Sequence, residues 1–250
     1  MVDIDRLAKE LDEALLGRRE IAPLGKTHGD FDLETAYRIQ ERGIALRLAR
    51  GEKIVGYKMG LTSAAKRAQM SLGLPIYGVL TDAMRVEGSL RVGDGVHPKV
   101  EPEIAFVTGR QLSGHVSRSQ AFAALQGVAP ALEILDSRFT GFKYFSLPDV
   151  VADNCSSWKF VLGPVQDPRD TGGLAMRMRV DGRVAQEADS NAISGHPLES
   201  LVQLVVLLPH PLPAGSIVLA GAATVAEALR PGMEIALLVE GLGSVSLRAS

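Results

Sequence analysis

Two stretches near the start of the chain place an apolar residue at every third or fourth position. They cover residues 4–15 and 33–48, and each follows an aspartate, Asp3 or Asp32, that can accept hydrogen bonds from the first turn of a helix. Gly51 comes shortly after the second stretch and is typical of a helix end. The pattern therefore predicts two amphipathic helices at the beginning of the chain, with a polar segment between them.

Beyond residue 53 the apolar positions form short runs or alternate with polar ones, which is typical of strands. The predicted strands cover residues 54–59, 97–107, 131–136, 158–162, 176–180, 216–220, 234–239 and 244–248. The predicted helices cover residues 62–70, 119–126 and 198–208; Gly127 should end the second of them, and residues 73–78 should form a loop. Asp181-Gly182 and Gly241-Leu242-Gly243 predict hairpin turns.

The order of these elements predicts an α+β fold, because the strands do not alternate regularly with helices. We expect a helical N-terminal segment at residues 1–52 and a catalytic, β-rich domain at residues 53–250, which together form one structural unit.

Glutamates stand where two of the predicted strands should carry apolar side chains. Side chains alternate between the faces of a strand, so Glu101 and Glu103 point the same way, while Glu133 lies among aliphatic residues in another strand. Three converging carboxylates would repel one another unless a hard cation such as Mg²⁺ bound between them. A second interpretation stays open on the residues alone: the glutamates lie on a solvated face and pair with Lys or Arg.

Three further features are candidates for chemistry. Lys58 is flanked by Gly56 and Gly60, whose bare backbone could let a ligand approach, although a lysine at a strand end can equally reach solvent. Residues 153–157 are small and polar, and could bind a carboxylate or form a capping turn. Cys155 is expected to be a small buried residue rather than a nucleophile.

Composition excludes several classes of partner. The 250 residues are 46% hydrophobic with a formal net charge of −2, which gives no field suited to nucleic acid or an anionic membrane. There is no apolar run of transmembrane length and no signal-peptide pattern, and the single cysteine excludes an internal disulfide, so we expect a cytoplasmic protein. His97 and His196 lack the spacing of a zinc motif, so zinc is rejected.

Six motifs occur in an order that covers nearly the whole chain. They are residues 56–63 (GYKMGLTS), 75–78 (PIYG), 97–105 (HPKVEPEIA), 133–138 (EILDSR), 152–157 (ADNCSS) and 241–245 (GLGSV). Together they resemble the 2-oxopent-4-enoate hydratase / 4-oxalocrotonate decarboxylase family of the fumarylacetoacetate hydrolase superfamily.

The resemblance implies a mixed β-sheet or β-roll core of the fumarylacetoacetate hydrolase type, often assembled into a homo-oligomer. It implies Mg²⁺ or Mn²⁺ held by Glu101, Glu103 and Glu133. Lys58 matches the family lysine near the reacting end of the substrate, and we expect Lys58 and Glu101 to be catalytic. Contacts to the substrate are expected from Lys58, Gly60, Leu61, Ile76, Tyr77, Asp153, Asn154, Ser156 and Lys159.

Ile76 separates the two branches of this family. The hydratases typically carry an aspartate there, which can move protons to or from water, whereas Ile76 resembles the decarboxylase version. An apolar, water-poor wall favours loss of CO₂, because it destabilises the departing carboxylate relative to its neutral product. The run at residues 66–70 also looks decarboxylase-like.

The implied reaction is metal-dependent decarboxylation of 4-oxalocrotonate (2-oxohex-3-enedioate) to 2-hydroxypenta-2,4-dienoate and CO₂ in catechol meta-cleavage, with a 2-oxo dicarboxylate as substrate. One alternative is hydration of 2-oxopent-4-enoate. Another is hydrolysis of an acylpyruvate, for which the sequence suggests no Glu–His pair in the N-terminal helical region. The last is a weakly active partner subunit in a complex with the pathway hydratase, favoured by Ala220-Gly221-Ala222, which replaces the family Thr-Gly pair.

Overall fold

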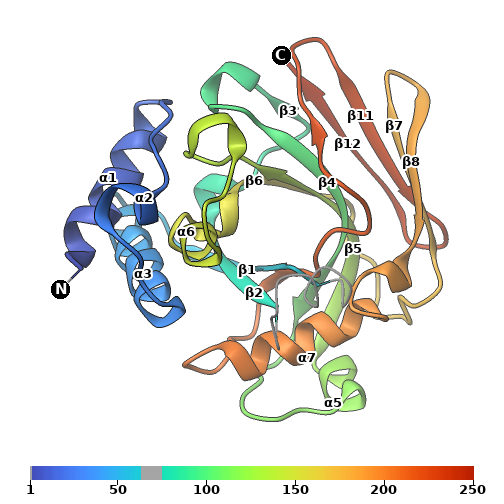
Figure 1. The fold of residues 1–250 in the computed structure, drawn as a ribbon. Helices are drawn as coiled ribbons and strands as arrows, with labels where there is room; N and C mark the ends of the chain where they lie inside the picture. The colour runs from blue at the N-terminus through green and yellow to red at the C-terminus, as the bar shows by residue number, and fades with distance from the viewer. Residues whose placement is uncertain (1, 63–74) are drawn as a thin grey trace.

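Two β-sheets form the centre of the molecule in the computed structural model, which describes residues 2–62 and 75–250 (Figure 1). The first sheet has the strand order β2-β1-β9-β4-β5-β6, and β10 pairs with β4. Its strands are β1 (Ile54–Gly60), β2 (Ile76–Thr81), β4 (Lys99–Thr108), β5 (Leu125–Leu135), β6 (Ser157–Leu162), β9 (Ile217–Leu219) and β10 (Glu227–Ala228). The pair β1–β9 is parallel and its neighbours are antiparallel, so the sheet is mixed, as predicted.

The second sheet has the order β3-β12-β11-β7-β8. Its strands are β3 (Ser89–Leu90), β7 (Ala175–Val180), β8 (Arg183–Asp189), β11 (Glu234–Val239) and β12 (Gly243–Ala249). Asp181 and Gly182 join β7 to β8 with φ of 50° and 77°, which confirms the predicted hairpin turn, because two successive positive φ angles are what a type I′ turn requires.

One face of the first sheet packs against the second sheet and against the helices α5 (Arg118–Ala123) and α7 (Pro197–Leu207), which lie below the sheets in Figure 1. This large core contains, for example, Ile104, Phe106 and Leu132 from the first sheet and Leu237 and Leu247 from the second. These side chains come from alternate positions of their strands, as expected for strands with two distinct faces.

The opposite, inner face of the first sheet holds a smaller apolar cluster and the candidate charged residues. Register determines this, because directly paired residues point to the same side of a sheet. Lys58 pairs with Leu219, and Glu133 pairs with Phe160; both partners belong to the smaller cluster. The candidate charged side chains, which are costly to bury, therefore lie together on the inner face.

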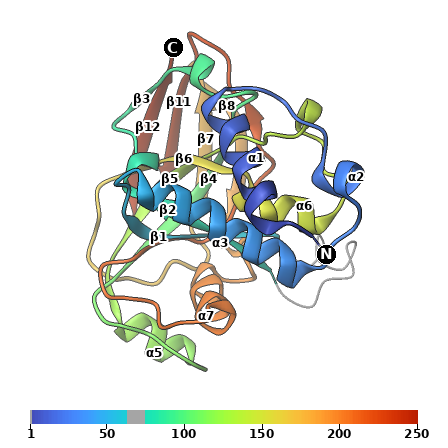
Figure 2. The ribbon, with the colours of Figure 1, turned by 90° about the vertical axis from the view of Figure 1, so that its left-hand side faces the viewer.

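Four helices cover this side of the molecule, as the view in Figure 2 shows. They are α1 (Ile4–Leu16), α2 (Leu24–His28), α3 (Leu33–Ala49) and α6 (Leu147–Ala152). The side chains of Asp3 and Asp32 accept hydrogen bonds from the backbone N–H groups of Arg6 and Thr35, so both predicted caps are confirmed. Short 3-10 turns occur at Asp82–Met84, Val92–Asp94, Thr140–Phe142, Asn154–Ser156 and Ser190–Ala192.

Two local predictions were wrong. The helix expected at residues 119–126 ends at Ala123, because the ladder with β4 already begins at Leu125 and includes Gly127. The loop expected at residues 73–78 ends earlier, since Ile76 opens β2 and pairs with Gly60. The predicted helix at residues 62–70 lies, apart from Thr62, outside the described residues. The elements α2, α6, β2, β3 and β10 had no counterpart in the sequence-based prediction, and β8 was implied only by the predicted hairpin turn.

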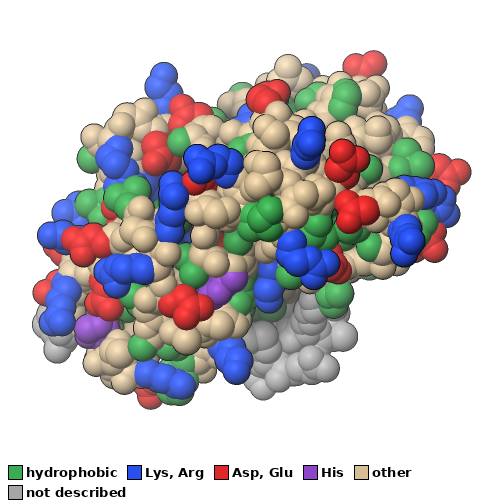
Figure 3. Space-filling view, turned by 90° about the horizontal axis from the view of Figure 1, so that it is seen from above, with side chains coloured by type: hydrophobic (Ala, Val, Ile, Leu, Met, Phe, Trp, Pro, Cys, Tyr) green, Lys and Arg blue, Asp and Glu red, His purple; other side chains and the backbone are tan. Residues whose placement is uncertain are grey.

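The helical side and the sheet share one apolar cluster. Leu7, Ile39 and Val151 of the helices pack in this cluster with Ile76 of β2 and with Cys155. The cluster therefore contains residues from both sides of the boundary proposed at residue 52, and that boundary stays a prediction. On the face seen in Figure 3, basic and acidic side chains are interspersed. None of the helices in the described ranges combines the length and apolarity that crossing a bilayer requires.

Candidate metal and substrate site

The register of β4 and β5 brings three glutamates together on the inner face of the first sheet. Glu101 lies directly opposite Glu133, and Glu103 follows two residues further along the same face of β4. One carboxylate oxygen from each residue lies within 4.8 Å of the other two. The predicted convergence of the three acids is therefore confirmed, and the interpretation as a solvated face is wrong for Glu103 and Glu133, which are fully buried.

The cluster has an excess of buried negative charge. Burial raises the pKa of Glu103 well above its ordinary value, and the charges of Glu133 and Glu101 raise it further. The Oε2 atom of Glu103 accepts a hydrogen bond of 2.8 Å from the Gly221 N–H, but its Oε1 atom has no hydrogen-bond partner within the described chain. A buried carboxylate oxygen without a partner is costly, and a cation bound there would satisfy it.

Lys58 is a basic residue that faces the glutamates. Its side chain is 4% exposed, and its Nζ lies 3.0 Å from Oε1 of Glu133 and donates a hydrogen bond of 3.2 Å to Oε2. Burial alone would lower the pKa of Lys58, but Glu133 foremost, with Glu101 and Glu103, raises it above its ordinary value. The Lys58–Glu133 pair leaves the buried Glu103 carboxylate to be balanced, and a divalent cation with oxygen ligands would do so.

A cavity of about 250 Å³ opens beside the cluster. Five of the predicted residues line it: Lys58, Gly60, Leu61, Ile76 and Glu101. Cavities of this size and mixed lining are typical of small-molecule sites. The apolar side chain of Ile76 forms part of the wall, as the prediction required.

Tyr77 and Lys159 are not among the residues that line this cavity, and their contact with substrate stays a prediction. Tyr77 points to the other face of β2, where its ring stacks on that of Tyr37 with centroids 4.8 Å apart. Lys159 pairs in register with Ile134, on the opposite face from Glu133, and its Nζ donates a hydrogen bond of 2.8 Å to the Ala83 carbonyl.

Asp153, Asn154 and Ser156 support the cavity from behind rather than line it. Asp153 pairs with Arg138, and the Asn154 side chain accepts from the N–H of Val79 and donates to its carbonyl, at 2.8 and 2.9 Å. Ser156 shares a hydrogen bond of 2.5 Å with the hydroxyl of Tyr144, which does line the cavity. Their contact with substrate stays a prediction.

Sequence reasoning missed several residues of the cavity wall, among them Lys99, Phe142 and Tyr144. The Nζ of Lys99 lies 4.0 Å from the centre of the Phe142 ring. A signal for Lys99 was present, because it precedes Glu101 by two residues on a strand and so shares its face. Phe142 and Tyr144 come from the irregular segment between β5 and α6, where no periodicity predicts direction.

Histidines lie outside the glutamate cluster. His97 contacts the Ser137 carbonyl through Nε2 at 2.7 Å, and His196 is the N-cap of α7, which agrees with the rejection of zinc. One expectation was wrong: a Glu–His pair does exist in the N-terminal helical region, since His28 lies 3.0 Å from Glu10. Neither residue lines the cavity, so the pair cannot act on a ligand there.

The Ala220-Gly221-Ala222 segment also lies at the site. Gly221 has a φ of 105°, and a Cβ at this position would lie 2.5 Å from the Thr62 side chain. Its N–H holds Glu103, as described above, and Ala222 lines the cavity. The backbone therefore supplies a polar contact at this segment without a hydroxyl.

Comparisons with known proteins agree with this geometry. Residues 59–249 match the family model "Fumarylacetoacetate (FAA) hydrolase C-terminal". The chain is 46% identical to a 4-oxalocrotonate decarboxylase of Pseudomonas sp, over 97% of this chain and 96% of the relative. It is 38% identical to a 2-keto-4-pentenoate hydratase of Paraburkholderia phymatum, over 97% and 95%.

Among solved structures, the fold matches that of the 4-oxalocrotonate decarboxylase from Pseudomonas putida G7 complexed with magnesium and adipate. The TM-score is 0.95, the sequence identity is 36%, and the match covers 99% of this chain and 97% of the other. The chain therefore belongs to the fumarylacetoacetate hydrolase family, in the branch that contains the 4-oxalocrotonate decarboxylases and the 2-keto-4-pentenoate hydratases.

Proposed function

We propose that this protein catalyses the metal-dependent decarboxylation of 4-oxalocrotonate to 2-hydroxypenta-2,4-dienoate and CO₂. The observation that carries the proposal is the convergence of Glu101, Glu103 and Glu133 beside a cavity whose wall includes Ile76. The similarity to 4-oxalocrotonate decarboxylases supports the choice of reaction. The dicarboxylate adipate, bound by the relative of known structure, supports a dicarboxylate as the substrate class.

The residues present fit a Mg²⁺ or Mn²⁺ ion. Glu101, Glu103 and Glu133 would hold it, since the Oε1 atom of Glu103 lacks a partner among the described residues and carboxylate oxygens are the ligands that hard cations prefer. When bound, the ion stabilises negative charge that develops on the C2 oxygen of a 2-oxo acid. Glu101, the least buried of the three, faces the cavity and would contact the substrate as well.

The balance of the reaction defines what the other residues must do. The C5–C6 bond breaks, its electron pair passes into the conjugated chain towards the C2 oxygen, and one proton is taken up as neutral CO₂ leaves. The Lys58 ammonium is held by Glu133 at the cavity wall, where it can orient a substrate carboxylate or deliver this proton. Gly60 lets the substrate approach the backbone, and Leu61 and Ile76 keep water from the departing carboxylate.

Enzyme assays test this proposal directly. Purified protein is freed of metal with a chelator, supplied with Mg²⁺ or Mn²⁺, and mixed with 4-oxalocrotonate, and both CO₂ and the loss of substrate absorbance are measured. We expect one CO₂ per substrate consumed, and only with metal present. Equal activity in the chelated protein would contradict the role of the ion.

Hydration of 2-oxopent-4-enoate is the second candidate, and similarity to hydratases favours it. Product analysis separates the two, because hydration yields 4-hydroxy-2-oxopentanoate and no CO₂. We expect Ile76→Asp to lose decarboxylase activity and to gain hydration, since a carboxylate at this wall admits water and can move its protons. Ile76→Leu, which keeps an apolar wall, is the matched control. If Ile76→Asp gains no hydration, the role of Ile76 in choosing the reaction is unsupported.

We also propose that the protein forms a homo-oligomer in the cytoplasm and can associate with the hydratase that consumes its unstable product. An apolar surface hollow lined by Tyr37, Leu48, Ile54, Tyr57 and Tyr77 supports self-association. Light scattering measures the molar mass of the particles in solution. A sample of the protein alone tests self-association, and a mixture with the hydratase tests the complex. A weakly active partner subunit remains the alternative, and metal titration distinguishes it, because such a subunit need not bind Mg²⁺.

A further inference from the structure

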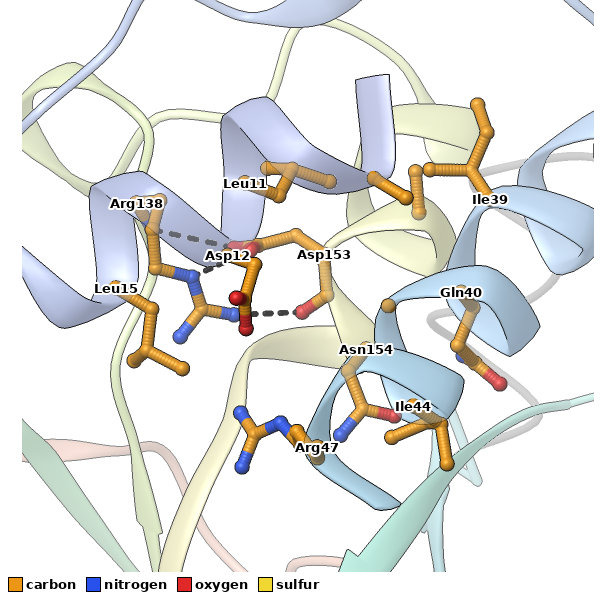
Figure 4. A pocket seen from close by; sticks show the side chains of 13 residues that line it. Leu11, Asp12, Leu15, Ile39, Gln40, Ile44, Arg47, Arg138, Asp153 and Asn154 are labelled. Carbon is orange, nitrogen blue, oxygen red and sulfur yellow. Dashed lines mark hydrogen bonds and ion pairs between the residues drawn. The ribbon is translucent and has the colours of Figure 1, made fainter. Parts of the chain in front are cut away.

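A small cavity lies apart from the glutamate cluster, between the N-terminal helices and the segment that follows β5. Its volume is about 30 Å³, and its lining includes Leu11 of α1, Ile44 and Arg47 of α3, and Arg138 and Asp153 (Figure 4). Both arginines are buried, with exposed fractions of 9% and 2%. Buried guanidinium groups stay charged and carry five N–H donors each, so each of them needs several acceptors.

Arg138 lacks an acceptor for one of its nitrogens. Its Nε pairs with the Asp153 carboxylate, and its Nη2 donates a hydrogen bond of 2.8 Å to the Asp153 carbonyl. Its Nη1 is fully buried and has no hydrogen-bond partner in the ranges that the structure describes. Figure 4 shows Arg47 among the residues that line the same cavity.

Arg47 has only a long ion pair among the described residues. The nearest carboxylate is that of Glu52, 3.8 Å from Nη1, which is too far for a hydrogen bond. Asp12 also lines the cavity, but its two oxygens already accept hydrogen bonds of 2.7 and 2.9 Å from Arg50. Burial lowers the pKa of Arg47; Glu52 offsets part of this, and the neighbouring charge of Arg138 lowers it further. Two guanidinium groups thus line one small space, and within the described residues Nη1 of Arg138 is a buried donor without an acceptor.

An approach route for anions leads to this space. Arg47 also lines a surface hollow of about 520 Å³, whose charged side chains are Arg18, Arg47, Arg50, Arg91 and Lys159 against Glu52 and Asp94. A concave surface with this excess of positive charge raises the local concentration of anions. Arg47 stands between the hollow and the small cavity, since it lines both.

We propose that the small cavity binds one monoatomic anion of the size of chloride, held between Nη1 of Arg138 and the guanidinium group of Arg47. The volume favours a small ligand, because about 30 Å³ leaves little room beyond that of a water molecule. A halide accepts from both groups without needing acceptors of its own. The bound anion would stabilise the packing of α3, through Arg47, against Arg138 and its partner Asp153. This role is independent of the proposed reaction.

Bromide provides the test, because it replaces chloride and scatters anomalously. Crystals of the wild-type protein soaked in bromide should show an anomalous peak between Arg47 and Arg138. In solution at constant ionic strength, with gluconate replacing bromide, the unfolding midpoint should rise by about 3–5 °C for each tenfold increase of bromide above its Kd. Arg47→Gln should lose this rise.

Arg91→Gln is the matched control, since Arg91 is exposed and lines only the outer hollow. It should keep the wild-type response to bromide. An ordered water without an anomalous peak in the cavity would overturn the proposal, and so would an equal bromide response in the wild type and Arg47→Gln. If Arg47→Gln fails to fold, the anomalous map of the wild-type crystal decides alone. Decarboxylase activity enters none of these measurements.

Discussion

The charges of four side chains, Lys58, Glu101, Glu103 and Glu133, govern the inner cavity at the scale of the residue. Their convergence was predictable, because alternation places Glu101 and Glu103 on one face and the motif around Glu133 matches the same family. The ion pair of Lys58 with Glu133 was not predictable, since it spans two strands that are not neighbours in the sheet. The sequence pattern predicts on which face of a strand a side chain lies. Its contact partners depend on which other strands lie near that face.

Glu103→Gln separates metal binding from folding. We expect Mg²⁺ affinity to fall at least about 100-fold, because a carboxylate ligand is lost. The metal-free protein should be as stable as the wild type or more stable by about 1–3 kcal/mol, because the change removes a buried carboxylate whose Oε1 has no partner in the part of the chain that the structure describes. Calorimetric Mg²⁺ titration and urea unfolding measure the two effects. Glu234→Gln, at an exposed site in β11, is the control; unchanged Mg²⁺ affinity in Glu103→Gln would refute the assignment.

The turn from Asn154 to Ser156 decides the cavity's shape at the scale of the element. Its three residues have φ of 49°, 51° and 57°, a backbone conformation that residues other than glycine rarely adopt. The cluster was predicted as either a carboxylate site or a capping turn, and the structure favours a structural turn. What the sequence could not indicate is the partner, because Asn154 bonds to Val79, 75 residues away.

Asn154→Ala should therefore weaken both folding and activity. Two hydrogen bonds to β2 are lost and the buried backbone groups of Val79 are left unpaired, which should lower the free energy of unfolding by about 2–4 kcal/mol. Substrate turnover should fall as well, since Cys155 and Ile76 line the cavity on either side of this contact. Urea unfolding and steady-state kinetics measure the two effects, with the exposed Asn191→Ala as control. A stability equal to wild type would show that the turn does not depend on this side chain.

The whole molecule combines three apolar clusters with one polar pocket on the inner face of a sheet. Sequence patterns predicted the two long N-terminal helices and most strands, because these have a clear period. They missed α2 and α6, which span 5 and 6 residues and are too short to show one. They also missed Phe142 and Tyr144, because the direction of side chains in irregular segments depends on tertiary packing.

Metal removal should leave this framework folded, since the apolar clusters do not involve the glutamates. Mg²⁺ should then stabilise it by mass action, by about 2.7 kcal/mol at 100 times its Kd, which corresponds to a rise of about 5–11 °C in the unfolding midpoint. Differential scanning calorimetry with Mg²⁺ and with a chelator measures this rise. A midpoint that does not respond to Mg²⁺ would mean that the buried charge is balanced in some other way.

Crystallography with Mn²⁺ and the unreactive substrate analogue 2-oxoadipate tests the central claim most directly, because manganese is located by its anomalous scattering. Our account predicts one manganese peak bonded to oxygens of Glu101, Glu103 and Glu133, with the 2-oxo acid bound to the same ion and its far end towards Ile76. A manganese ion that binds elsewhere, or that contacts none or only one of the three glutamates, would contradict it.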